Sequence, residues 1–226
     1  MIAENLKAIE EKIAQKCLKS GRNLHEITLV AVSKTQPLQI IQESINAGLF
    51  NLGENKAQEL RDKADSFSGN IKWHFIGHLQ TNKVKYIIKH TALIHSVDSI
   101  KLAEEINRRA ELLNKKQDVL LEIKTSDEAA KYGIADEKEI FNTAECCLRL
   151  SNLNLTGLMT MAPFTEKEND IRSSFIKLRN IKDKLNSSGF NLTQLSMGMT
   201  NDYEIAIEEG STILRIGTAI FGQRNY

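Results

Sequence analysis

The chain has 226 residues, which favours a single domain, and 41% of them are hydrophobic, enough to form a sizeable core. Its 30 basic and 29 acidic residues leave a net charge of +1, and this balance gives no long-range field for nucleic acid or anionic lipid. No apolar stretch is long enough to span a bilayer, so we expect one domain over residues 1–226 that binds neither membranes nor nucleic acid.

The N-terminal residues 1–18 predict an amphipathic helix and not an apolar signal segment. Their apolar side chains recur every three or four residues and so form one stripe. The stripe consists of Ile2, Leu6, Ile9, Ile13 and Cys17.

Three cysteines, Cys17, Cys146 and Cys147, are the whole thiol content of the chain. Two of them are adjacent, which is not a metal-ligand spacing, and an odd number is a poor disulfide framework. We therefore expect buried or idle thiols, no metal site and a reducing, cytoplasmic location.

Eight short apolar runs follow the first helix and predict eight strands. They are Thr28–Ser33, Leu49–Leu52, Ile71–Ile76, Leu93–Val97, Val119–Ile123, Leu153–Leu158, Leu192–Leu195 and Thr212–Ile216. Helical patterns lie between most of them, and such alternation predicts a parallel sheet covered by helices. Eight units indicate a closed (β/α)8 barrel of the TIM type, for which about 250 residues are typical. The alternative is an open doubly wound sheet, but no Gly-x-Gly-x-x-Gly segment follows the first run.

Several of the predicted helices carry start and stop signals. Pro37 opens a helix and Gly48 closes it, in keeping with the preference for proline at the start and glycine just past the end. A second apolar stripe predicts a helix over residues 170–186. Asn201 is interpreted as the N-cap of the next helix, which Gly210 ends.

A lysine, Lys34, stands directly after the first apolar run, Thr28–Ser33. Most lysines are solvated surface residues, and that is the default interpretation of any one of them. In a barrel, however, the carboxyl ends of all strands meet at one mouth, where active sites are built. Burial at the edge of a core disfavours the ammonium form of lysine and frees its amine to attack a carbonyl. We therefore predict that Lys34 forms a Schiff base.

The last two runs end in small and polar residues that suit a phosphate group. The two segments are Ser196-Met197-Gly198 and Arg215-Ile216-Gly217-Thr218. Loops after strands seven and eight commonly form the phosphate site of such barrels, through backbone N–H groups and hydroxyls. Alternatively, the glycines merely make tight turns.

Arg215 has two interpretations. One is a salt bridge across the barrel rim. The other is a guanidinium that faces a pyridine nitrogen and, because it can only donate hydrogen bonds, leaves that ring unprotonated. Lysine for an aldehyde, arginine for a ring nitrogen and loops for a phosphate together predict pyridoxal 5'-phosphate, PLP, as the cofactor.

Other polar residues near the predicted strand ends have less specific signals. His78 is either a proton shuttle or a histidine that stacks or makes a hydrogen bond. We interpret His74 and His95, inside predicted strands, as hydrogen-bonded core residues. Glu54, Asp98 and Glu122 are acid–base candidates for which capping or ion pairing is the safer interpretation.

Six motifs spread along nearly the whole chain resemble those of the pyridoxal-phosphate homeostasis proteins, which are similar to the N-terminal barrel domain of alanine racemase. The motifs are Ala31-Val32-Ser33-Lys34-Thr35, Gly53-Glu54-Asn55, Trp73-His74-Phe75-Ile76-Gly77-His78-Leu79-Gln80 with Asn82-Lys83, Gly157-Leu158-Met159-Thr160-Met161-Ala162-Pro163, Ser196-Met197-Gly198-Met199 and Arg215-Ile216-Gly217-Thr218-Ala219-Ile220-Phe221-Gly222.

This resemblance implies a role for each matching residue. Lys34 would carry PLP as a Schiff base, and Arg215 would face the pyridine nitrogen. The phosphate would be held by Ser196, Gly217 and Thr218, in the loops that also contain Gly198. The pocket would be lined by Asn55, His78, Met159 and Met197. Family members are described as buffering or delivering PLP without clear turnover, so apo PLP-dependent enzymes are the implied recipients.

The chain departs from the family pattern at a few positions near the predicted mouth. Leu52 and Lys56 stand where the family usually has aromatic residues, and Ile123-Lys124 stands where Val-Asn is common. Thr200 replaces a common serine and keeps the hydroxyl. The two lysines would make the mouth more basic than in other members.

Two other functions remain as alternatives, a PLP-dependent amino-acid racemase and a cofactor-free Schiff-base aldolase. In alanine racemase a tyrosine opposite the lysine comes from an additional domain of a partner subunit, and this sequence stops at Tyr226. We therefore expect a PLP carrier, monomeric or weakly dimeric, with at most weak racemase activity.

Overall fold

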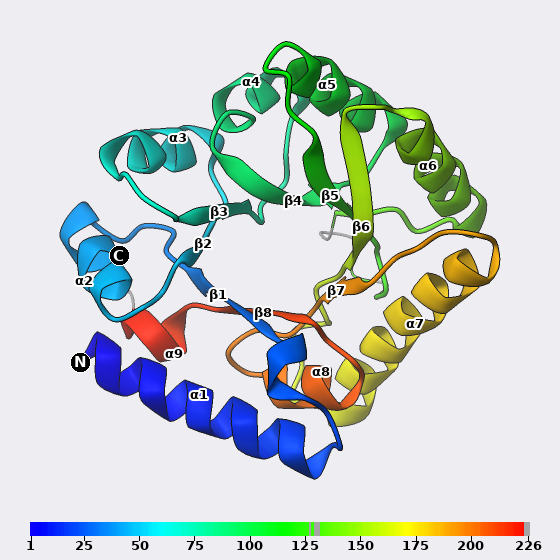
Figure 1. Cartoon of the computed structure of the whole chain (residues 1–226). Coiled ribbons are helices and arrows are strands. Elements are labelled where there is room, and N and C mark those ends of the chain that lie inside the picture. Colours follow the sequence, from blue (N-terminus) through cyan, green and yellow to red (C-terminus); the bar gives the residue numbers. More distant parts are fainter. Residues whose placement is uncertain (127, 129–131, 224–226) are drawn as a thin grey trace.

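In a computed structural model, which describes residues 1–126, 128 and 132–223, the chain forms a closed barrel of parallel strands surrounded by helices (Figure 1). The strands are β1 (Thr28–Val32), β2 (Asn51–Glu54), β3 (Lys72–Phe75), β4 (Thr91–Val97), β5 (Gln117–Glu122), β6 (Leu153–Met159), β7 (Gln194–Ser196) and β8 (Ile213–Ile216). Each strand pairs with its neighbours in chain order, and β1 also pairs with β8. The predicted TIM-type barrel is confirmed, and this closure excludes the open doubly wound sheet.

The helices follow the strands around the outside of the barrel (Figure 1). They are α1 (Ile2–Lys19), α2 (Leu38–Asn46), α3 (Ala57–Ser66), α4 (Val84–Ile87), α5 (Ile100–Glu111), α6 (Glu137–Arg149), α7 (Glu168–Ser187), α8 (Tyr203–Glu208) and α9 (Thr218–Phe221). Two short 3-10 helices, η1 (Leu24–Glu26) and η2 (Thr81–Lys83), complete the described elements. Among these residues, no helix is both long and apolar enough to cross a membrane.

The predicted N-terminal helix is confirmed as α1, and it covers α8 and α9 (Figure 1). Its predicted apolar stripe is buried. The side chain of Asn5 donates a hydrogen bond to the carbonyl of Ile220 at 2.9 Å, which ties α1 to the end of the chain. The three cysteines are free and buried, as predicted. Burial raises the pKa of the Cys147 thiol to about 12.

Apolar residues form two cores, because successive residues of a strand point to opposite faces. One core lies between the barrel and its helices. A smaller one fills the barrel interior and consists of Val30, Leu93, Leu120, Met159 and Ile213, with Met161 packed against it.

Two strands, β2 and β7, begin two residues later than predicted. The runs Leu49–Leu52 and Leu192–Leu195 marked strands that the structure places at Asn51–Glu54 and Gln194–Ser196. Leu49 and Leu192 are buried in the outer core just before each strand, so their hydrophobicity reflects burial and not strand pairing. The predicted cap of α8 is also wrong, since Asp202 and not Asn201 occupies its N-cap position.

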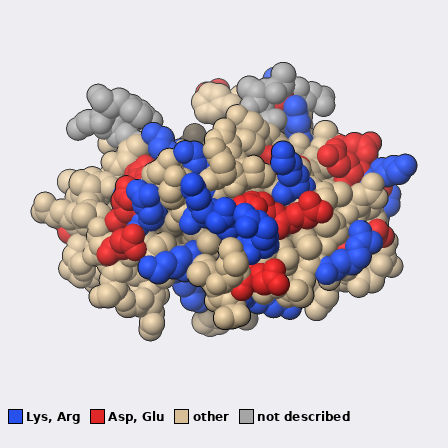
Figure 2. Space-filling view, turned by 90° about the horizontal axis from the view of Figure 1, so that it is seen from above, with Lys and Arg blue, Asp and Glu red and all other residues tan. Residues whose placement is uncertain are grey.

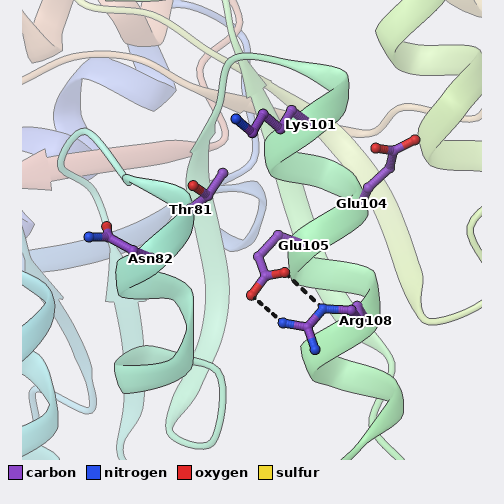
Figure 3. A pocket seen from close by; sticks show the side chains of 6 residues that line it. All are labelled: Thr81, Asn82, Lys101, Glu104, Glu105 and Arg108. Carbon is purple, nitrogen blue, oxygen red and sulfur yellow. Dashed lines mark hydrogen bonds and ion pairs between the residues drawn. The ribbon is translucent and has the colours of Figure 1, made fainter.

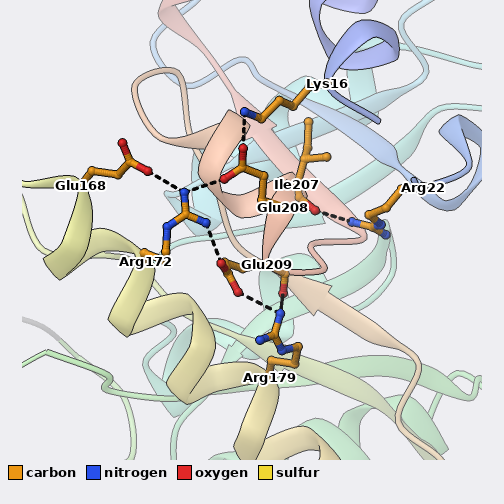
Figure 4. Close-up of polar contacts among 8 residues, drawn as sticks. All are labelled: Lys16, Arg22, Glu168, Arg172, Arg179, Ile207, Glu208 and Glu209. Atoms are coloured by element: carbon orange, nitrogen blue, oxygen red, sulfur yellow. Dashed lines mark hydrogen bonds and ion pairs between the residues drawn. The ribbon is translucent and has the colours of Figure 1, made fainter. Parts of the chain in front are cut away.

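An ionic network fixes α8 against α1 and α7 (Figure 4). From α7, Arg172 donates to Glu208 at 2.5 Å and to Glu209 at 2.7 Å, and Arg179 donates to Glu209 at 2.8 Å. From α1, Lys16 pairs with Glu208. This network braces α8, which follows the loop predicted to hold a phosphate.

On the face that Figure 2 shows, basic and acidic side chains are interspersed and do not form a field of one sign. This mixture agrees with the net charge of +1.

Candidate functional site

Lys34 and Arg215 come from strands that pair with each other. Lys34 is half-buried and follows the carboxyl end of β1, and Arg215 lies on β8 with Val30 as its partner in the β1–β8 register. The residue after Lys34 has an unusual backbone, because Thr35 adopts a φ of 65°. Left-handed backbone is rare for a residue with a branched Cβ.

The guanidinium of Arg215 is inside the barrel and not on its rim. The residue is only 4% exposed, and it donates to the Ser196 hydroxyl at 2.5 Å and to the Thr160 carbonyl at 2.9 Å. It thereby links the ends of β6, β7 and β8. Burial lowers the pKa of Arg215 to about 10, which still leaves it charged at neutral pH.

A chain of buried hydrogen bonds continues from Arg215 across the barrel. The Ser196 hydroxyl lies 2.9 Å from Nδ1 of His95, whose Nε2 lies 2.9 Å from Nδ1 of His74. Nε2 of His74 is in turn 3.2 Å from the side-chain oxygen of Asn51. Because the Asn51 oxygen can only accept, neutral histidines in this row donate through Nε2 and accept at Nδ1, and the Ser196 hydroxyl donates to His95. We refer to Arg215, Ser196, His95, His74 and Asn51 as the polar chain.

Both histidines of the polar chain are neutral. Burial lowers the pKa of His74 to about 4 and holds that of His95 well below its usual value. Their interpretation as hydrogen-bonded core residues is confirmed. Their connection to Arg215 had no signal in the sequence. The Ser196 hydroxyl contacts Arg215 and His95. The predicted contact of Ser196 with a phosphate stays a prediction, and it is based on the position of Ser196 at the start of the loop after β7.

The loop after β7 depends on Gly198. This residue has a φ of 96°, and a Cβ there would lie 2.6 Å from the Cβ of Ala206 on α8. Its carbonyl accepts from the backbone N–H of Arg215 at 2.9 Å, which joins the β7 loop to β8. Only glycine combines this backbone conformation with so close an approach to α8.

The other predicted cofactor-binding residues at the ends of β6, β7 and β8 differ in how deeply they are buried. Gly217 is the buried N-cap residue of α9, and Thr218 is exposed as its first residue. Met159 is buried in the barrel interior, whereas Met197 is buried in the outer core. Their contacts with a cofactor remain predictions.

Asn55 and His78 lie together at the ends of β2 and β3. A Cβ on Gly77 would lie only 2.3 Å from the carbonyl oxygen of Asn55, so glycine permits this close approach. The His78 ring stacks on Tyr132 with centroids 3.9 Å apart, and its Nδ1 is 3.4 Å from a carboxylate oxygen of Asp98. Stacking, one of the two safer interpretations of His78, is therefore confirmed, and Asp98 contacts the same ring.

A pocket of about 260 Å³ adjoins Asn55 and His78. It is lined by Asn55, Lys56, Ala57, Gln58, Phe75, His78, Leu79, Gln80 and Lys83. Lys56, one departure from the family pattern, therefore contributes to this pocket. The other, Lys124, is half-buried just beyond β5.

A second pocket, of about 420 Å³, lies between η2 and α5, away from Lys34 (Figure 3). It is lined by Thr81, Asn82, Lys101, Glu104, Glu105 and Arg108. The carboxylate of Glu105 already accepts two hydrogen bonds from Arg108, so this surface is internally paired.

The two acid–base candidates Glu54 and Glu122 differ in their hydrogen-bond and ion-pair partners. Glu54 forms an ion pair with Lys63 at 2.8 Å, as the safer interpretation predicted. Glu122 is 3% exposed, and its Oε2 has no hydrogen-bond partner among the described residues. Burial, reinforced by the charge of Asp98 and opposed by that of Arg215, raises the pKa of Glu122 to about 7. Glu122 is therefore a titratable group in the barrel interior.

The family model for the alanine racemase N-terminal domain matches residues 4–225. The pyridoxal phosphate homeostasis protein of Aquifex aeolicus is 44% identical over 99% of this chain and 98% of that protein. The structure of PipY from Synechococcus elongatus with PLP bound is 32% identical, with a TM-score of 0.86 over 98% of this chain and 100% of that one. An alanine racemase of Clostridium difficile shares the fold at 14% identity, with a TM-score of 0.76 over 96% of this chain and 57% of that one. The chain belongs to the alanine racemase N-terminal domain family and, within it, to the pyridoxal phosphate homeostasis proteins.

Proposed function

We propose that this chain binds PLP and holds it in reserve for PLP-dependent enzymes, without robust turnover of its own. The observation that carries the proposal is the pairing of β1 with β8, which brings a half-buried lysine and a buried arginine to the same mouth. The names of its relatives and the PLP-bound structure of PipY support it.

The residues at the mouth fit such a cofactor. When bound, PLP supplies an aldehyde that takes up an amine and a ring that withdraws electrons. Lys34 offers the amine, Arg215 a donor for the ring nitrogen, and Met159 an apolar wall. Anion-binding positions come from the small-residue loops at Gly198 and Gly217.

Each side chain then has a proposed role. Lys34 attaches the cofactor, Arg215 faces its ring nitrogen, and Ser196, Gly198, Gly217 and Thr218 surround its phosphate. The pocket is completed by Asn55, His78, Met159 and Met197. Residues 1–226 act as one PLP-binding unit in the cytoplasm, as a monomer or weak dimer, with apo-enzymes as recipients.

Weak turnover is supported by the state of Arg215. Its pKa of about 10 keeps the guanidinium protonated at neutral pH, so that it can donate to the ring nitrogen but cannot protonate it. An unprotonated ring is the weaker electron sink, which disfavours carbanion chemistry.

The test is attachment at Lys34. The purified protein should absorb visible light with PLP, and borohydride should fix PLP on the peptide that contains Lys34. Lys34→Ala should lose both signals and keep its fold, because a mouth residue contributes little to core packing. Lys12→Ala, an exposed lysine of α1, is the matched control and should retain both. An adduct that persists at another lysine in Lys34→Ala would refute the assignment.

A further inference from the structure

A second lysine, Lys63 of α3, is buried directly behind the β1 terminus. It is 6% exposed, and its Nζ donates to the carbonyl of Ser33 at 2.8 Å, to Glu54 at 2.8 Å and to Glu59 at 2.7 Å. Three acceptors match the three N–H groups of an ammonium ion. Lys63 is therefore engaged as a fixed cation and is not a second nucleophile.

The bonds of Lys63 reach the backbone on both sides of Lys34. The preceding carbonyl, that of Ser33, accepts directly from Lys63. The following N–H, that of Thr35, donates to Glu59 Oε1 at 2.7 Å, and the same oxygen accepts from Lys63. The peptide groups that flank Lys34 are thus both tied to one ion pair of α3.

The bonds to Lys63 and Glu59 hold the backbone at Thr35 in a conformation that is unfavourable by itself. Thr35 is one of two described non-glycine residues with a positive φ, and it lies directly after Lys34. Such backbone is maintained only where surrounding contacts determine it, and it is frequent at functional sites. The Glu59 bond to the Thr35 N–H is such a contact.

Glu54 connects Lys63 to the strands of the barrel. It is fully buried at the end of β2, and its Oε1 accepts from the Ser33 hydroxyl at 2.6 Å as well as from Lys63. Burial raises the pKa of Glu54 against the influence of Lys63. Burial also acts to raise the pKa of Glu59, but bonds from Lys63 and Thr35 outweigh it and lower that pKa. Lys63 thus pairs with both carboxyl groups, and its bond to Glu59 favours the charged form of Glu59.

We propose that Lys63 and Glu59 are positioning residues for Lys34: they hold its flanking peptide groups so that its amine meets a carbonyl ligand in one orientation. The inference rests on the proposed function of Lys34 as the attachment lysine. A buried ion pair contributes little net stability, because desolvation opposes its attraction. A positioned reacting group, in contrast, gains much in rate.

The test compares Lys63→Met, Glu59→Gln and the conservative Lys63→Arg, with Lys12→Met as the matched control. PLP uptake by each apo-protein is followed by visible absorbance. Independently of PLP, the amine of Lys34 is labelled by formaldehyde and a hydride donor over a range of pH and quantified on its peptide. Lys63→Met should slow PLP uptake by at least about tenfold, since misplacing a reacting group costs up to about a hundredfold. It should also change the pH profile of Lys34 labelling, whereas Lys63→Arg should restore much of both and Lys12→Met should alter neither.

A purely structural role would lower the thermal midpoint of Lys63→Met and leave both Lys34 readouts at the parental values below that midpoint, which would overturn the inference. If Lys63→Met does not fold, Glu59→Gln provides the test. This variant keeps a side-chain oxygen that can accept from the Thr35 N–H but removes the negative charge that faces Lys63, and it should alter both Lys34 readouts. If PLP does not attach at Lys34 in the parent protein, the proposed function fails, while the labelling profile still decides whether Lys63 positions this amine.

Discussion

The side-chain oxygen of Asn51 and the neutrality of the two histidines determine the directions of the hydrogen bonds in the polar chain. Because that oxygen only accepts, His74 donates to it through Nε2, His95 donates to Nδ1 of His74, and Ser196 donates to Nδ1 of His95 while it accepts from Arg215. Each histidine therefore carries its proton on Nε2 and stays neutral. Arg215 is held in place by uncharged groups that do not compete with a ligand for its charge.

Glu122 is expected to make stability pH-dependent in a recognisable direction. Its pKa is about 7 in the folded protein and about 4.5 when exposed, so its stabilising contribution is complete below pH 4.5 and is lost as pH rises through 7. Glu122→Gln should remove this loss, which corresponds to about 3 kcal/mol at alkaline pH.

The measurement is the free energy of unfolding in urea of parent and variant from about pH 4 to about pH 8. The difference between the two curves isolates Glu122 from other titrating groups. Glu11→Gln, an exposed glutamate of α1, should follow the parent curve. Parallel curves for Glu122→Gln and the parent would contradict a pKa of Glu122 raised by burial.

Neighbouring elements approach each other closely at three glycines of the barrel. Gly77 lets β3 pass the Asn55 carbonyl, and Gly157 of β6 would bring a Cβ within 1.9 Å of the Gln194 carbonyl oxygen. Gly198 does the same for the β7 loop and α8. Of these three contacts, the one at Gly198 positions a loop that is proposed to surround the phosphate.

Gly198→Ala separates backbone strain from crowding when it is compared with Gly189→Ala. Gly198 and Gly189 have nearly the same φ, 96° and 98°, but a Cβ on Gly189 would meet no atom within 4 Å. Gly189→Ala should therefore cost only backbone strain, about 1–3 kcal/mol. Gly198→Ala should cost more, because its Cβ also displaces Ala206, and it should weaken PLP binding. Urea unfolding and PLP titration measure the two effects. Equal losses of stability would contradict a tight β7–α8 contact.

For the molecule as a whole, the proposed PLP site predicts that the protein holds the cofactor and turns over amino acids slowly at most. Incubation of PLP-loaded protein with L-alanine in deuterated water should give slow exchange at Cα at most, without net D-alanine. The reason is that a protonated Arg215, in its proposed position facing the ring nitrogen, would leave the ring unprotonated. Racemisation near the median enzyme rate of about 10 per second would refute the carrier proposal and favour a racemase.

Most of the fold could be predicted from the sequence, because alternating apolar runs and amphipathic helices record which residues are buried. This pattern led to eight strands and the barrel. It misplaced the starts of β2 and β7, where Leu49 and Leu192 are buried outside the strands. The spacing of apolar residues predicts that a residue is buried, but it does not show whether the residue lies within a strand or in the loop beside it.

The sequence by itself also determined which strand ends carry Lys34 and Arg215 and, by resemblance, the family of the chain. Only the tertiary structure showed what holds these residues. The contact of His95 with Ser196 joins residues 101 positions apart, and that of Lys63 with Ser33 spans 30. Such contacts leave no local pattern, because they arise when barrel closure brings distant strand ends together. The chemistry of each side chain is thus encoded locally, whereas its partners, and hence its protonation state, follow from closure of the barrel.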